Sequence, residues 1–320
     1  MLPTQIAQRD PSLTAMALEY KPKELVLDRL GPMLESDNRR IQYVKLDKLN
    51  MFQDVDHRFS RDGEANEVGA GGTKVIEALS NRALKTTISK EDIEDSDDFF
   101  DVAAIQVETM RHTLALQREK EQAALIVSSL NTAGRTIDPG NWSDFSASFV
   151  DVFGQVRTAQ EAAWVPYDGA IIPIQVLYKL QRHPSLLSQY FDGNSGRKTV
   201  TLDGLKELFG VSDIIVPEAR IATQRRPQSA PADLSTIPYV FGNNVVLFRK
   251  AVGQPSRALP GFYYQWRRRW LKGVVGENMQ VRTWDLPNKG IGGAYVVQQE
   301  YQVKHMVFPE MGYMFKDVLT

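Results

Sequence analysis

The sequence predicts an α+β protein in which extended segments surround one long helix and one compact α/β unit. Three observations support this class. Four prolines within residues 1–40 favour an extended arm over long helices. A long helical pattern follows the acidic run 91–101, and an alternating pattern near residue 300 predicts a half-buried strand. Because an arm and a protruding hairpin bury little on their own subunit, this organisation is typical of a chain that packs on its neighbours.

The composition limits the class of protein. The chain has 320 residues, enough for roughly two domains of about 150 residues each. Its formal net charge of -1 creates no global basic field that would recruit nucleic acid. Cysteine is absent, which excludes disulfides, thiolate metal sites and cysteine nucleophiles. The longest mostly apolar stretch, 170–178, is far shorter than the roughly 18 residues that span a bilayer, and the first residues lack a secretory pattern. We expect a soluble intracellular protein with no membrane association.

The first 90 residues are predicted to form an arm and then a hairpin. One short helix is expected within the arm, from about Pro22 to Leu30. The segments Ile41–Leu49 and Arg82–Ile88 are strand-like, and the charged, glycine-rich residues between them have little to bury. Two strands that flank a long polar excursion predict an extended hairpin that leaves the main body.

A long amphipathic helix is predicted from about Asp97 to Leu130. At 1.5 Å per residue it would be roughly 50 Å long. Ser96 is its expected N-cap, and the preceding acidic residues suit a helix N-terminus. The apolar stripe comprises Phe100, Ala103, Val107, Met110 and Leu114, and continues at Ala124 and Leu125.

A compact α/β unit is predicted from Pro166 to about Pro260, after an amphipathic helix at Trp142–Ala162. Inside the unit, a buried strand turns into a helix near Pro173, and HPSLLSQYF forms a short helix. TVTLDGLKELFGV is expected to run strand, turn, helix, and DIIVPEARI to form a strand. A hairpin is expected around Gly242. Further along, GAYVVQQEYQVKHMVF alternates apolar and polar residues and predicts a long strand.

No segment carries a complete catalytic, cofactor or metal motif. The stretch EVGAGGTK lacks the hydroxyl residue that must follow the lysine of a phosphate-binding loop, since Val75 follows Lys74. The acidic run lacks the glycine of a calcium loop, and GNSGR lacks the spacing of a nucleophile elbow. The histidines are too far apart in sequence for a metal motif: His57, His112, His183 and His305. We predict no catalytic, cofactor-binding or metal residues and no enzyme, although residues that converge from distant segments would escape this search.

The stretch FYYQWRRRWLKG is the strongest nucleic-acid candidate, because arginines beside aromatics can hold phosphates and stack on bases. As a strand it would place Tyr264, Trp266 and Trp270 on one face. Arg267 and Arg269 would lie on the other face. We interpret it as a strand with a charged, partner-facing side and keep nucleic-acid binding as the alternative.

The order of these segments resembles the major capsid proteins of tailed bacteriophages, whose fold is shared with encapsulins and the herpesvirus capsid floor. The resemblance covers nearly the whole chain. It rests on PYDGAIIPIQVLYKLQRHPSLLSQY, TVTLDGLKELFGVSDIIVPEARI, YVFGNNVVLFRKA and EYQVKHMVFPEMGYMF, in that order. It implies five segments: an N-terminal arm (1–40), an extended loop (41–90), a spine helix with the first part of a peripheral domain (91–160), an axial domain (161–262) and the second part of the peripheral domain (263–320).

The resemblance implies a structural head protein that self-assembles, as hexamers and pentamers, into an icosahedral shell around the double-stranded DNA of a tailed phage. It places the protein in the virion after assembly in the host cytoplasm. Because the sequence has no N-terminal segment of scaffold length, the resemblance implies that scaffolding is separate or dispensable. Portal and decoration proteins are further partners that the resemblance implies. Some members form a Lys–Asn cross-link, but nothing in this sequence selects Lys74, Lys85 or Asn288 for one.

The hairpin and the arm supply the predicted site residues. Arg39 and Arg40 are the candidate DNA-facing residues. The candidate intersubunit contacts are Arg58, Arg61, Asp62, Glu64, Glu67, Gly69, Gly71, Gly72 and Lys74. The glycines are expected to adopt positive φ and turn closely against a neighbour. Two alternatives stay open: an encapsulin-like shell around a protein cargo, and a cytosolic α+β enzyme whose site converges only in three dimensions.

Overall fold

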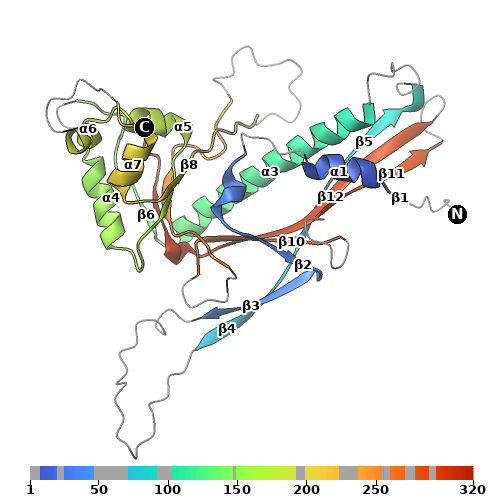
Figure 1. Ribbon diagram of the computed structural model, residues 1–320, viewed down its shortest axis with the longest axis horizontal. Helices are drawn as coiled ribbons and strands as arrows, with labels where there is room; N and C mark the ends of the chain where they lie inside the picture. Colours follow the sequence, from blue (N-terminus) through green and yellow to red (C-terminus); the bar gives the residue numbers. More distant parts are fainter. Residues whose placement is uncertain are drawn as a thin grey trace, which may run out of the picture.

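The computed structural model is elongated, with helix α3 (Val102–Thr132) running along a long sheet toward a group of short helices (Figure 1). Helices and strands are mixed, which confirms the predicted α+β class. The structure describes residues 8–19, 25–46, 71–91, 102–146, 149–191, 199–222, 237–253, 255, 260–270, 278–287 and 293–319.

The six-stranded sheet is built around β12 (Ala294–Val307), whose 14 residues confirm the predicted long strand. Its other strands are β1 (Gln8–Arg9), β2 (Met33–Ser36), β5 (Ser80–Ser89), β10 (Tyr263–Arg268) and β11 (Met279–Leu286). β12 pairs antiparallel with β5, β10 and β11. β1 pairs with β11, and β2 lies parallel to β10. The first and last described segments of the chain therefore meet in one sheet.

Helix α3 packs on this sheet through the predicted stripe only in its first half. Val107, Met110 and Leu114 are buried with residues of β11 and β12, as expected. Ala124 is exposed, and Ala123 and Ile126 are buried in its place. The prediction failed there because polar residues of α3 occupy buried positions and interrupt the apolar pattern. Phe100 and Ser96 lie outside the described residues.

The N-terminal arm is more ordered than predicted. Helix α1 (Pro11–Glu19) starts at a proline, which is tolerated there because the first helical N–H has no intrahelical partner. Its Leu13 and Ala17 are buried in the same core as the first half of α3. The described part of the short helix expected from about Pro22 to Leu30 contains one 3₁₀ turn, η1 (Leu27–Leu30), and residues 22–24 lie outside the described residues.

The extended hairpin exists but pairs differently from the prediction. β3 (Arg40–Leu46) pairs antiparallel with β4 (Gly72–Ala78), from Arg40 opposite Ala78 to Leu46 opposite Gly72. The second predicted strand, β5, leaves this ribbon and joins β12 instead. The sequence analysis took the residues of β4 for part of the polar excursion, because glycines precede them. In Figure 1 the β3–β4 ribbon projects from the body.

The five-stranded sheet forms the other end of the molecule, in the order β6-β13-β9-β7-β8. Its strands are β6 (Thr136–Ile137), β7 (Gly169–Ile171), β8 (Asp213–Ile215), β9 (Val245–Phe248) and β13 (Gly312–Phe315), the last preceded by the 3₁₀ turn η4 (Pro309–Met311). The helices beside it are α4 (Val152–Glu161), α5 (Ile174–Leu180), α6 (Pro184–Tyr190) and α7 (Leu202–Phe209). The predicted strand-to-helix change at Pro173 and the helices α6 and α7 are confirmed.

Three local predictions in this part were wrong. The helix expected from Trp142 begins at Val152, and Trp142 is instead buried against Phe315. No strand precedes α7, because Thr201 serves as its N-cap and accepts a hydrogen bond from the Gly204 N–H. No hairpin forms around residue 242, since β9 pairs with β7 and β13 rather than with the residues just before it.

Candidate functional site

The described residues do not form a cluster that could hold a metal ion, since none of their His, Asp and Glu side chains forms a group of three that could act as its ligands. Nor is any described helix long and apolar enough to cross a bilayer. His183 is buried at the start of α6, where its Nδ1 accepts a hydrogen bond from the Ser185 N–H. His305 contacts Tyr263, His112 lies on α3, and His57 is outside the described residues.

The β3–β4 ribbon is fixed to the body through one of its two faces. Tyr43 meets the ring of Phe308 edge-on, with 6.5 Å between centroids. Lys304 Nζ lies 2.7 Å from Glu77 Oε2, and a longer ion pair links Lys45 to the body. Burial and the Glu77 carboxylate raise the pKa of Tyr43 to about 12. The ribbon is therefore held at a set angle to the body.

The opposite face of the ribbon is exposed and partly apolar. Val44 is 38% exposed and Ile76 is 55% exposed. Lys74, opposite Val44 in the register, is exposed as well. These side chains give this face of the ribbon a small exposed area of mixed apolar and basic character.

The predicted contact residues are only partly described. Gly72, the first residue of β4, does not have the positive φ that was expected of it. Gly72 instead permits a close approach between strands, since a Cβ there would lie 2.8 Å from Val44 Cγ1. The remaining candidates lie outside the described residues: Arg58, Arg61, Asp62, Glu64, Glu67 and Gly69.

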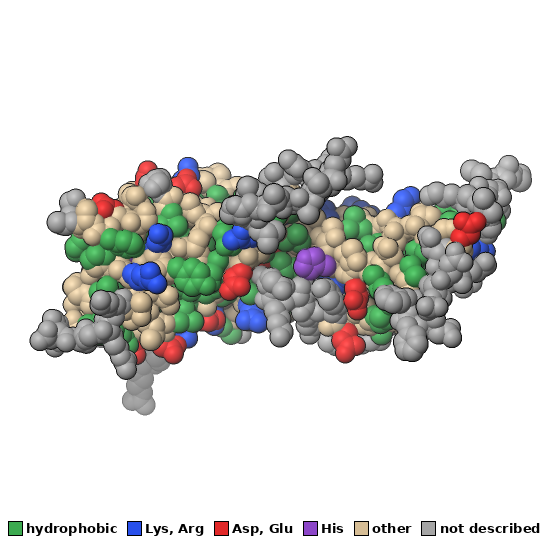
Figure 2. Space-filling model, turned by 90° about the horizontal axis from the view of Figure 1, so that it is seen from above, with side chains coloured by type: hydrophobic (Ala, Val, Ile, Leu, Met, Phe, Trp, Pro, Cys, Tyr) green, Lys and Arg blue, Asp and Glu red, His purple; other side chains and the backbone are tan. Residues whose placement is uncertain are grey.

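Arg39 and Arg40 are exposed at the start of β3. With Asn38, Gln42 and Ala78 they line an open hollow at the base of the ribbon. Figure 2 shows basic and acidic side chains interspersed on the face seen from above, rather than gathered in one basic patch. A DNA-facing role for the two arginines stays a prediction.

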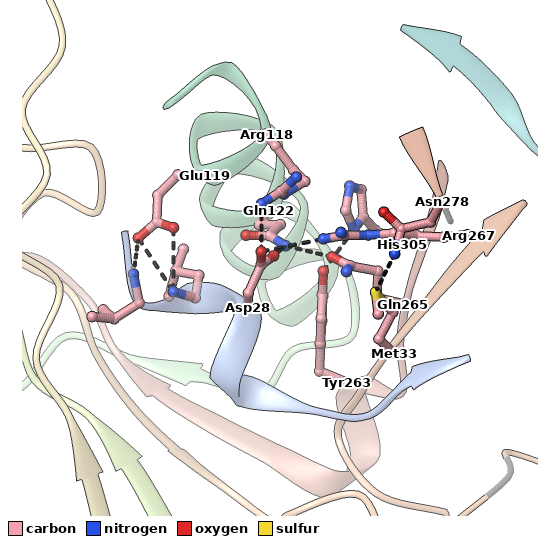
Figure 3. Close-up of polar contacts among 12 residues, drawn as sticks. Asp28, Met33, Arg118, Glu119, Gln122, Tyr263, Gln265, Arg267, Asn278 and His305 are labelled. Atoms are coloured by element: carbon pink, nitrogen blue, oxygen red, sulfur yellow. Dashed lines mark hydrogen bonds and ion pairs between the residues drawn. The ribbon is translucent and has the colours of Figure 1, made fainter. Parts of the chain in front are cut away.

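A polar cluster lies where the arm, α3 and β10 meet. We call Asp28, Arg118, Gln122, Gln265 and Arg267 the junction cluster (Figure 3). The Asp28 carboxylate, from η1, accepts hydrogen bonds from Arg118 Nη2, from Gln122 Nε2 at 2.9 Å and from Arg267 Nη2 at 3.2 Å. Three segments distant in sequence are thus joined through one carboxylate.

The electrostatics of the junction cluster are strongly coupled. Desolvation would raise the pKa of Asp28, but Arg118 and Arg267 outweigh it and hold that pKa well below its usual value. Burial and the neighbouring Arg118 lower the pKa of Arg267 to about 10. Rotating the Gln265 amide by 180° brings its oxygen 2.8 Å from Arg267 Nε, which satisfies both groups.

Two further buried groups flank the junction cluster. Both carboxylate oxygens of Glu119 on α3 accept backbone hydrogen bonds of the arm, from the N–H groups of Val26 and Leu27 at 3.2–3.3 Å. Burial raises the pKa of Glu119 to about 7. Burial and Arg118 lower the pKa of His305 to about 3, so this ring is neutral beside the Tyr263 hydroxyl.

Sequence reasoning missed the junction cluster. It assigned Arg267 to a partner-facing side, but this side chain is 6% exposed and pairs with Asp28. The available signal was the placement of Arg118 and Gln122, four residues apart, on the same helix side as the apolar Leu114 and Ile126. Polar residues on an apolar helix face indicate buried partners.

A second exposed surface lies at the end that carries the short helices. Hydrophobic side chains gather there in Figure 2. Phe145 is 44% exposed and Tyr178 is 61% exposed. Together with Lys179 and Arg182 they line a hollow beside α5 and the start of α7.

Two curated relatives are named major capsid protein. One, from Pseudomonas phage JBD67, is 21% identical over 317 residues, which is 97% of this chain and 97% of the relative. The other, from Burkholderia phage BcepMu, is 25% identical over 245 residues, which is 74% of this chain and 75% of the relative. No family model matches the chain.

Solved structures define the class of the fold. A phage-related protein from Bordetella bronchiseptica superposes with a TM-score of 0.67 at 19% identity and covers 98% of both chains. The capsid of cyanophage P-SCSP1u gives a TM-score of 0.53 at 10% identity and covers 92% of this chain and 89% of its own. An encapsulin complex from Synechococcus elongatus gives a TM-score of 0.53 at 13% identity, and the match covers 98% of this chain and 96% of the encapsulin chain. The fold is thus the shell fold of phage capsids and encapsulins.

The two curated relatives favour phage capsids over encapsulins within this fold class. Both are phage proteins, and the similarity to the first extends over nearly the whole of both chains. The predicted resemblance to phage major capsid proteins is therefore confirmed, and the role it implies is that of a structural capsid protein.

Proposed function

We propose that this chain is a structural, non-enzymatic head protein that self-assembles into an icosahedral shell around the double-stranded DNA of a tailed phage. The observation that carries the proposal is the similarity to a phage major capsid protein over 97% of both chains. The shell fold supports it independently. Assembly in the host cytoplasm and residence in the virion follow from this role.

The β3–β4 ribbon is our proposed contact between subunits. One face is fixed to its own body through Tyr43 and Glu77, and Ile76 and Lys74 are exposed on the opposite face, where a neighbour would contact them. The charged candidates that precede β4 would form exposed pairs worth about 0–1 kcal/mol each. Repetition around a closed shell would multiply these small terms.

The proposed partners follow the same role. Copies of this chain would form hexamers and pentamers, with scaffolding, portal and decoration proteins as separate chains. Contact with DNA would be electrostatic and independent of base sequence, through Arg39 and Arg40. Replacing both by alanine should lower the DNA retained by particles and flatten its salt dependence, while an Arg157→Ala, Arg182→Ala control should not.

Negative-stain microscopy of the purified full chain tests the proposal. Closed particles of uniform size are expected, and a protein that stays monomeric at high concentration, with or without a scaffold, would contradict it. Nuclease-treated particles should still contain protected DNA when they are isolated from infected cells. A copurifying protein cargo without DNA would favour the encapsulin-like alternative.

Deleting residues 61–72 tests the contact separately. Unfolding of the subunit should be nearly unchanged, because these residues precede the packed part of β4. Shell formation should be blocked or weakened. Normal closed particles from this variant would show that residues 61–72 are not needed for the contact between subunits.

A further inference from the structure

The junction cluster and its neighbour Arg111 bury more positive than negative charge. Arg111, Arg118 and Arg267 are exposed by 6%, 5% and 6%. Among the described residues, Asp28 is the carboxylate that pairs with Arg118 and Arg267. Glu119 does not add a second partner, because its oxygens accept from backbone N–H groups of the arm. Arg118 and Arg267 thus share one carboxylate, and Arg111 has no ion pair with it among the described residues.

Several buried donors on α3 lack an acceptor. Arg111 Nε and Nη1, and Arg118 Nη1, are buried without a hydrogen-bond partner in the described part of the chain. The two arginines are seven residues apart, so they lie on the same side of α3, roughly 10 Å apart along its axis. A buried ionised group without a partner costs free energy that pairing would recover. Within the described part of the chain, the arrangement therefore lacks one anion.

The titration of these groups agrees with that imbalance. Burial, and then repulsion from Arg118 and Arg267, lower the pKa of Arg111 to about 10. Asp28 and Tyr301 oppose that repulsion only in part, so the pKa of Arg111 stays lowered. The Asp28 side chain keeps 36% of its area exposed, so the junction cluster opens to solvent at η1.

We propose that Arg111 and Arg118 bind one oxyanion, which supplies the missing negative charge. A guanidinium group presents its N–H donors in a planar fork, which matches two oxygens of a carboxylate or a phosphate. The oxyanion has two possible sources: free phosphate bound within the subunit, or a side-chain carboxylate of a neighbouring copy of this chain. The second source rests on the proposed assembly, and the first does not.

Thermal unfolding of the full-length subunit, titrated with inorganic phosphate against sodium chloride of equal ionic strength, tests the first source. Phosphate should raise Tm in proportion to the logarithm of its concentration above Kd, on the order of 5 °C at a hundredfold excess. The rise should vanish in Arg111→Leu, persist in part in Arg111→Lys, and remain in Lys120→Leu, which removes a charge from the exposed side of the same helix. This outcome supports the proposal with phosphate as the ligand.

Shell yield in phosphate-free buffer tests the second source. A carboxylate of a second copy is the ligand if the Tm of the wild-type subunit does not respond to phosphate and Arg111→Leu lowers shell yield severalfold. The subunit Tm of Arg111→Leu should then be unchanged, and Lys120→Leu should keep the wild-type shell yield. Equal stabilisation by phosphate and chloride, together with normal shells from Arg111→Leu, would overturn the proposal. If the chain forms no shells under any condition, the phosphate titration alone decides, and a flat titration overturns it.

Discussion

The two ends of this protein are stabilised in different ways. The core between the five-stranded sheet and helices α4 to α7 is almost entirely apolar. Among the described residues, His183 and Ser185 are the polar side chains buried at this end. The region where η1, α3 and β10 meet buries a carboxylate and guanidinium groups beside its apolar residues. Dispersed apolar contacts hold the first region, whereas a single carboxylate joins three segments in the second.

This difference teaches where the molecule is tolerant and where it is specific. Apolar packing is non-directional. The free energy lost by truncating one apolar side chain therefore depends on the buried area and the cavity at that position alone. A buried ion pair adds little net stability, but removal of one partner leaves the other charge uncompensated. We therefore expect substitutions in the junction cluster to have larger and more distant effects than substitutions in the apolar core.

Asp28→Ala should have the largest effect, because Arg118 and Arg267 would lose their carboxylate while remaining buried. A loss of about 3–5 kcal/mol in the free energy of unfolding is expected. Urea denaturation measures it, with Asp203→Ala as the control, since that side chain is 85% exposed and pairs with Lys206. A change no larger than the control's, about 1 kcal/mol or less, would show that the carboxylate does not hold the junction.

Leu205→Ala in α7 should cost about 2–5 kcal/mol through the cavity it leaves, because the side chain is fully buried. Hydrogen exchange should accelerate in α4 to α7 and the five-stranded sheet, and much less in the first half of α3. In Asp28→Ala the pattern should reverse, with faster exchange in η1, α3 and β10. Uniform acceleration in both variants would mean that the two regions unfold as one unit.

Glu119→Gln should change the pH dependence of stability by roughly 1–3 kcal/mol. The folded protein holds this proton up to about pH 7, whereas the unfolded chain loses it near 4.5. The free energy of unfolding contributed by this group therefore falls as pH rises between these values and is level above them. The variant should lose this fall, and Glu108→Gln, exposed on the same helix, should keep it. Equal slopes in all three proteins would contradict the assignment.

Ile76→Asp should have the smallest effect on the subunit, within about 0.5 kcal/mol, because the side chain is 55% exposed. Its effect on shell yield should nevertheless be large if the outer face of the ribbon contacts a neighbour. Ile105→Asp, at 46% exposure on α3, is the matched control. Equal yields from the two variants would remove the ribbon from the list of contacts.

Local signals explain which elements were predictable from the sequence. The prediction of helix α7 was confirmed because both of its ends carry local signals. Thr201 caps its start, and Gly210 ends it in the left-handed region at φ 67°. The prediction of β12 was confirmed because a long alternation of apolar and polar residues fits a strand and does not fit a helix. The partner of β3 was wrong because strand pairing is not local, and the strand-like segment of β5 competed with β4.

The candidate site was less predictable than the fold for a physical reason. Asp28 is 90 residues from Arg118 and 239 residues from Arg267 in the sequence. No sequence motif can therefore contain all three. Their chemistry appears only when the arm crosses α3. The exposed ribbon could be predicted in outline, because a polar excursion between strands has nothing of its own to bury.

The order of synthesis gives the strand topology a further meaning. β12 and β13 are the last described strands of the chain, yet each lies between other strands of its sheet. Both sheets therefore stay incomplete on the ribosome until residues 294–315 have emerged. A nascent chain cut short before β12 would present neither finished surface, so translation itself limits which chains become competent to join a growing particle.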